Sequence, residues 1–216
     1  MYLRSVIVEA TDRDKNMVRD IEEYLSLRRQ TVGAEAVFAI YEFGLNLIDE
    51  VYYHPAVKEL INCIIELTLI DNASDTLFDD HVYQPPFAQD MASYNREQAT
   101  GDENHNLITV TMRELGLDRS GAMSWAAAYH SEIQAKFING LSELPSWGST
   151  LDSQLKEYLN GIANWAQGNY CWSYESQRYF GSKGPEIKKT RLVPLLPRSC
   201  PQKLHGKDIV IVDLQL

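Results

Sequence analysis

The sequence predicts an all-α protein. Apolar residues recur at spacings of three and four along most of the chain, as they do on one face of a helix. Glycine and proline fall between these stretches, where helices tend to end. The chain has 216 residues, 44% of them hydrophobic and 10% aromatic, which is typical of a globular protein with one sizeable core. A single helical domain accounts for this pattern.

The first third of the chain contains helical periodicity interrupted at two places. Gly33 follows the first periodic stretch and breaks the helix there. Pro55 separates the second stretch from a third, which is strongly apolar and runs toward Asp71. The helices predicted in this part span residues 16–29, 36–51 and 57–71.

Periodicity then fails in residues 73–89, ASDTLFDDHVYQPPFAQ, which include two adjacent prolines and no consistent apolar face. Because successive prolines remove backbone donors and clash with the preceding turn, this segment is predicted to be irregular. The segment therefore interrupts what would otherwise be one long helix.

Helical periodicity resumes after this segment. A polar link, 102–106, divides the next two predicted helices, and Gly116 and Pro145 mark later ends. Thr150 is predicted to cap the last long helix. The helices predicted here span residues 90–98, 107–115 and 120–141, followed by the last one from residue 151.

The chain ends in a segment, 199–216, to which no function is assigned. Its residues 209–212 are β-branched and favour a strand, but no partner strand is evident.

Composition excludes several classes of protein. A net charge of -10 argues against a nucleic-acid surface. Cys63, Cys171 and Cys200 lie far apart, which argues against a zinc site or a disulfide framework. Charges near the start interrupt any signal-peptide core, and no apolar run is long enough to span a membrane. We therefore expect a cytoplasmic protein.

One constellation of residues carries recognisable chemistry. If residues 73–89 are set aside, Asn72 leads directly into a helix with Ser93 and Glu97 on one face, since positions four apart lie nearly above one another. The pattern N-D-M-A-S-Y-N-R-E resembles the metal triad N-D-x-x-S-x-x-x-E of class I terpene cyclases of the fungal type. Arg96 lies beside the carboxylate and could reach a diphosphate. Alone, such a polar face would be read as solvated surface.

Two further motifs, in the order typical of that family, support the resemblance. LSLRRQTVGAE resembles the segment in which an arginine four residues before a helix-breaking glycine senses the diphosphate, and here these are Arg29 and Gly33. WSYESQRYFG resembles the segment with a diphosphate-binding Arg-Tyr pair, here Arg178 and Tyr179.

The resemblance implies the fold and the chemistry. Residues 1–198 are expected to form the C-terminal part of a terpene cyclase domain, an incomplete class I terpenoid synthase helical fold. Such an enzyme uses Mg²⁺ to ionise an isoprenyl diphosphate, here farnesyl diphosphate, to a cyclic sesquiterpene plus diphosphate. The implied metal ligands are Asn72, Ser93 and Glu97, and the implied diphosphate ligands are Arg29, Arg96, Arg178 and Tyr179.

The sequence also departs from the family. The aspartate-rich metal motif expected in the N-terminal half is absent, and Asp79-Asp80-His81-Val82-Tyr83 is read as a coincidence because it lacks the closing acid. Residues 73–89 separate Asn72 from Ser93, which is expected to impair the metal site. Two functions therefore stay open: a sesquiterpene cyclase, or an inactive remnant that folds as a helical module without catalysis.

Residues 73–89 are predicted to be a retained intron in the gene model. Codons for Ala73 with Ser74, and for Gln89, are compatible with GC–AG intron borders. We expect the mature transcript to join the codon for Asn72 to that for Asp90, which sequencing of that transcript would test. Finding the intervening codons in mature message would contradict this hypothesis.

Overall fold

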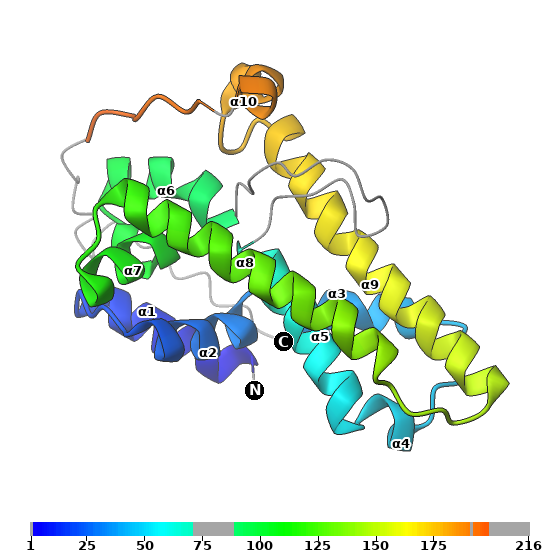
Figure 1. Ribbon diagram of the computed structural model, residues 1–216. Coiled ribbons are helices and arrows are strands. Elements are labelled where there is room, and N and C mark those ends of the chain that lie inside the picture. Colours follow the sequence, from blue (N-terminus) through cyan, green and yellow to red (C-terminus); the bar gives the residue numbers. More distant parts are fainter. Residues whose placement is uncertain (1, 71–88, 191, 199–216) are drawn as a thin grey trace, which may run out of the picture.

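The computed structural model describes residues 2–70, 89–190 and 192–198, and every regular element in these ranges is a helix (Figure 1). The all-α prediction is therefore confirmed for these residues. Before residue 71 the elements are α1 (Tyr2–Asp14), α2 (Ile21–Thr31), α3 (Ala34–Phe38), the 3-10 helix η1 (Ala39–Glu42), α4 (Asp49–Tyr52) and α5 (Pro55–Ile70). After residue 88 they are α6 (Gln89–Thr100), η2 (Glu103–His105), α7 (Leu107–Leu115), α8 (Arg119–Ser142), α9 (Ser149–Glu175), η3 (Gly181–Lys183) and α10 (Gly184–Thr190).

Helix α5 forms the centre of the core. It packs against α8 and α9 and also contacts α2 and α6. From Leu60 to Ile70 its side chains are buried, with the exception of Asn62. Each buried leucine or isoleucine side chain contributes about 1.5–3 kcal/mol through removal of apolar surface from water. This continuous burial explains why the apolar stretch predicted at 57–71 could be recognised from sequence.

The N-terminal region differs from the prediction. Helix α1 was not predicted, and the helix expected from Asn16 begins instead at Ile21. Asn16 adopts a left-handed conformation with φ of 51°, which ends the preceding helix. Asp20 then caps α2 by accepting a hydrogen bond from the Glu23 amide at 2.8 Å. The capping aspartate therefore sets the start of α2.

The single helix predicted for residues 36–51 was also wrong. The structure divides this stretch into α3, η1 and α4, joined by irregular backbone. Gly44 has φ of 88°, and the Asn46 amide donates to the Gln154 Oε1 of α9 at 2.8 Å. A hydrogen bond to another helix thus satisfies the Asn46 amide, which in a continuous helix would have been satisfied by a backbone carbonyl of the same helix.

The helices predicted after residue 88 agree closely with the structure. The stretches 90–98, 107–115 and 120–141 correspond to α6, α7 and α8 within one or two residues at each end. Gly116 ends α7 in the left-handed conformation expected of a C-terminal glycine.

Helix α9 begins two residues earlier and extends further than the sequence indicated. Thr150 was predicted to be its N-cap, but Gly148 occupies that position. The Asp152 carboxylate in the first turn accepts a hydrogen bond from the Trp147 amide at 2.8 Å, just before the helix begins. At its other end Tyr170 and Tyr174 are buried in a second small core formed with α10. Residues 192–198 then run from α10 to α6 (Figure 1).

Several predictions fall on residues that the structure does not describe. These are Asn72, the irregular character of residues 73–88, the Asp79–Tyr83 segment, and the strand at 209–212. Gln89, which was predicted to be the last residue of the irregular segment 73–89, is described and is instead the first residue of helix α6. Among the residues placed here, none of the helices combines the length and apolar character needed to cross a bilayer.

Gly33 is expected to resist substitution. It has φ of 77° in the turn between α2 and α3, a conformation that costs a residue with a Cβ about 1–2 kcal/mol. Gly33→Ala should therefore lower the free energy of unfolding by about that amount in urea denaturation. Gly168 lies inside α9 with open space around it, so Gly168→Ala should raise stability by about 0.5–1 kcal/mol. Equal effects at both glycines would contradict this reading.

Candidate metal and diphosphate site

Ser93 and Glu97 lie one helical turn apart on α6, and a third residue joins them. The Nδ2 group of Asn106 donates to Ser93 Oγ at 3.3 Å and to Glu97 Oε2 at 2.9 Å. Ser93 is buried, and Glu97 is half-buried. The structure thus brings together two of the three predicted metal ligands around one amide.

Asn106 is a residue that the sequence analysis missed. It was assigned to a polar link, whereas the structure buries it completely as the N-cap of α7. Its Oδ1 accepts from the Ile108 amide at 2.9 Å. The available signal was its position immediately before the predicted helix 107–115, since asparagine is a preferred N-cap residue.

The oxygen donors on α6 fit a hard divalent cation. Hydroxyl and carboxylate oxygens are ligands of the kind that Mg²⁺ binds, together with water or substrate oxygens. Asn72, the third predicted ligand, lies outside the described residues. Within those residues no three His, Cys, Asp or Glu side chains gather into a metal cluster. A ligand set of Asn, Ser and Glu contains only one residue of those four types, so it is not a cluster of that kind.

Arg29 pairs with a buried carboxylate that the sequence analysis did not single out. Its guanidinium forms an ion pair with Glu66 of α5, with Nε donating to Oε1 at 2.6 Å. Tyr129 of α8 donates its hydroxyl to the other oxygen, Oε2, at 2.7 Å. Burial, with the hydrogen bond to Glu66 as the next contribution, raises the pKa of Tyr129. The phenol therefore stays protonated and remains a donor to Glu66.

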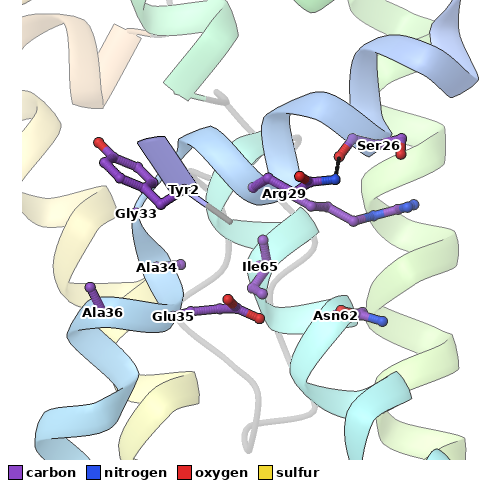
Figure 2. A pocket seen from close by; sticks show the side chains of 10 residues that line it. Tyr2, Ser26, Arg29, Gly33, Ala34, Glu35, Ala36, Asn62 and Ile65 are labelled. Carbon is purple, nitrogen blue, oxygen red and sulfur yellow. Dashed lines mark hydrogen bonds between the residues drawn. The ribbon is translucent and has the colours of Figure 1, made fainter. Parts of the chain in front are cut away.

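A cavity of about 540 Å³ lies beside Arg29 and Gly33 (Figure 2). In Figure 2 the Arg29 side chain extends away from Gly33. The residues that line the cavity come from α1, α2, α3 and α5 and from the α2–α3 turn: Tyr2, Ser26, Arg29, Gln30, Gly33, Ala34, Glu35, Ala36, Asn62 and Ile65.

Arg178 and Tyr179 lie at the C-terminal end of α9. The exposed Arg178 guanidinium lies 6.0 Å from the Trp172 ring centroid and 5.7 Å from that of Tyr179, within cation–π range. Tyr179 packs against the second small core. Arg96, on α6, is exposed.

The predicted site residues therefore fall into three groups in the structure. Ser93 and Glu97 are joined through Asn106, Arg29 is joined to Glu66, and Arg178 lies within cation–π range of its own neighbours. From the resemblance we predict that five of the site residues face one common cavity: Arg29, Ser93, Glu97, Arg178 and Tyr179.

Two amide side chains of α6 hold the C-terminal strap, residues 192–198. Asn95 donates to the Pro194 carbonyl at 3.0 Å and accepts from the Leu196 amide at 2.8 Å. Gln98 donates to the Leu196 carbonyl at 2.8 Å. The helix that carries Ser93 and Glu97 is thus fixed on a second side by backbone from the end of the chain.

Comparison with known proteins gives consistent matches. The family model described as "Terpene synthase family 2, C-terminal metal binding" matches residues 1–136. Sesquiterpene synthase 14 of Postia placenta is 44% identical over 216 residues, which cover 99% of this chain and 57% of that protein. The Delta(6)-protoilludene synthase of Armillaria gallica is 41% identical over 209 residues, which cover 97% of this chain and 55% of that protein. The chain thus spans little more than half the length of these relatives.

Solved structures share the fold at low sequence identity. Linalool/nerolidol synthase from Streptomyces clavuligerus superimposes with a TM-score of 0.66 at 18% identity, covering 80% of this chain and 55% of that one. Germacradien-4-ol synthase from Streptomyces citricolor gives a TM-score of 0.61 at 20% identity, covering 80% of this chain and 51% of that one. At these identities the likeness concerns the helical fold alone.

Glu66 is expected to be the acidic residue of α5 on which stability depends most. Glu66→Ala leaves Arg29 and Tyr129 without their shared acceptor, and removing one partner of a buried pair costs about 3–5 kcal/mol. Because the Arg29 side chain is 36% exposed, we expect the lower end of that range. Glu59→Ala on the same helix removes a half-exposed pair with Lys136 and should cost about 1 kcal/mol or less. Urea unfolding followed by circular dichroism measures both, and equal losses would contradict the role of Glu66.

Proposed function

Because this chain belongs to the terpene synthase family, we propose that it is the C-terminal, metal-binding part of a sesquiterpene cyclase. The proposed reaction is the magnesium-dependent ionisation of farnesyl diphosphate to a cyclic sesquiterpene and diphosphate. The observation that carries the proposal is the pairing of Ser93 with Glu97 around the Asn106 amide, in a chain with the helical fold of class I terpene synthases.

Ser93 and Glu97, together with Asn72, are the residues proposed to hold magnesium. When bound, the metal supplies Lewis-acid stabilisation of the negative charge on the departing diphosphate. The chain contributes one hydroxyl and one carboxylate at fixed positions on α6, with an amide from Asn72 as the third ligand. A single carboxylate leaves the cation with net positive charge with which to attract an anionic substrate.

Arg29, Arg96, Arg178 and Tyr179 are the residues proposed to bind the diphosphate. The guanidinium of Arg178 is exposed and lies within cation–π range of the Trp172 and Tyr179 rings, and a guanidinium can bind phosphate oxygens through two parallel N–H groups. Arg29 is already paired with Glu66, so a diphosphate would share this guanidinium with the carboxylate. This pairing holds the Arg29 guanidinium against Glu66 of α5.

The aromatic core suits a carbocation pathway. Trp125 and Tyr129 stack with ring centroids 5.2 Å apart, and Phe38 meets Trp165 edge-on at 5.8 Å. Aromatic faces attract cations, and an apolar cavity excludes the water that would quench them. The sesquiterpene class is proposed from the relatives, which are named as sesquiterpene and Delta(6)-protoilludene synthases.

One observation favours a second candidate, an inactive helical module. In the chain as given, residues 73–89 separate Asn72 from Ser93, so one helix cannot bring both to the same metal ion. On this alternative the chain folds but does not turn over substrate.

An activity assay separates the two candidates. We expect a protein in which Ala73–Gln89 are deleted and an N-terminal half from a relative is fused to release diphosphate from farnesyl diphosphate with Mg²⁺. The chain as given should release little or none, because its ligand set is divided. In the repaired protein Glu97→Ala should reduce release to background, since a methyl group cannot ligate a cation.

The matched control for that assay is Glu132→Ala, which removes an exposed carboxylate from α8 and should leave the rate unchanged. Abundant cyclic product from the chain as given would contradict the proposed damage. Full activity of Glu97→Ala would contradict the metal site itself.

A further inference from the structure

We propose that Asn106 is a positioning residue that orients Ser93 and Glu97 as metal ligands before any metal binds. This inference rests on the proposed function and concerns a residue to which the sequence motifs assigned no role. A single amide group reaches Ser93 Oγ at 3.3 Å and Glu97 Oε2 at 2.9 Å, although the two acceptors lie on successive turns of α6. The two side chains therefore share one hydrogen-bond donor.

The Asn106 side chain is itself held in place. Asn106 is completely buried, and its Oδ1 accepts from the Ile108 amide at 2.9 Å while its carbonyl accepts from the Val110 amide at 3.1 Å. Leu107 and Ile108, the next two residues, are also completely buried. With its acceptor held by the first turn of α7, the amide has one orientation in which Nδ2 is directed at α6. Helix α7 thus sets the positions of two side chains on α6.

The chemistry of an amide suits this task better than that of a cation. Asn106 is neutral, so it orients the Glu97 carboxylate without offsetting the negative charge that a divalent cation requires. Its bond to Ser93 is accepted by Oγ, and a hydroxyl oxygen carries two lone pairs. Replacing a residue that hydrogen-bonds to a metal ligand commonly changes the affinity for the metal by about 10–100-fold.

A merely structural capping role predicts a different outcome, and two variants separate the roles. Asn106→Ser keeps a capping oxygen at the start of α7 but is too short to reach both Ser93 and Glu97. Asp20→Ser makes the same kind of exchange at the cap of α2, where Asp20 accepts from the Glu23 amide. Both variants retain a preferred cap residue, so both should fold.

The experiment measures Mn²⁺ binding by the full chain in the presence of inorganic diphosphate, using electron paramagnetic resonance. We expect Asn106→Ser to weaken Mn²⁺ binding by about 10–100-fold and Asp20→Ser to change it by about twofold or less. If the unaltered chain binds Mn²⁺ and Asn106→Ser binds it equally well, the role of Asn106 is overturned and the metal site stands. If the unaltered chain binds no Mn²⁺, as its divided ligand set predicts, the same comparison is made in the repaired protein that lacks residues 73–89. Absence of Mn²⁺ binding there overturns both the metal site and the role of Asn106.

A second measurement uses the unaltered protein and does not depend on the folding of a variant. Because the hydrogen bonds are proposed to exist without metal, the Asn106 side-chain amide protons should exchange slowly in metal-free protein observed by nuclear magnetic resonance. Replacing Glu97 with alanine should speed that exchange. Fast exchange in the unaltered, metal-free protein would overturn the proposal.

Discussion

Burial of α5 among α2, α6, α8 and α9 is the constraint on which the rest of the structure depends. A helix surrounded in this way must either be apolar throughout or provide partners for each polar group that it carries. Glu66 is the charged residue within this buried stretch, and it meets the requirement by accepting from Arg29 of α2 and Tyr129 of α8. One buried carboxylate therefore ties three helices together.

This arrangement links stability to the candidate site. The cation proposed to bind a diphosphate is the same one that neutralises Glu66, so the need to satisfy a buried charge holds the Arg29 guanidinium against α5. Such pairing holds the guanidinium in place without substrate, and pre-organised charge needs no rearrangement when the substrate arrives. The core and the site are thus built from shared residues.

Helix α6 is held by a different kind of interaction. It receives neutral amide contacts on two sides, from Asn106 before α7 and from the C-terminal strap through Asn95 and Gln98. Asn106, Asn95 and Gln98 are neutral, so these contacts fix the helix without offsetting the negative charge of Glu97. The contrast with Glu66, whose charge is matched by Arg29, distinguishes a carboxylate used for folding from one proposed to bind metal.

Local pattern explains which parts of the fold could be predicted. The stretches 90–98, 107–115 and 120–141 were predicted well because apolar spacing and Gly116 act within a few residues. The division of 36–51 could not be predicted, since it depends on a hydrogen bond from Asn46 to a residue of α9. Helix α1 was missed because its apolar side chains remain largely exposed and give no clear inward face.

The sequence by itself determined the helical class and the residue types of the candidate site, since periodicity and the spacing of Ser93 and Glu97 are local properties. Only the tertiary structure decided that Asn106 joins those two residues and that Glu66 holds Arg29. An asparagine in a polar link and a glutamate in an apolar helix carry no sign of their partners, because the partners come from other helices. Packing alone brings these groups within hydrogen-bonding distance.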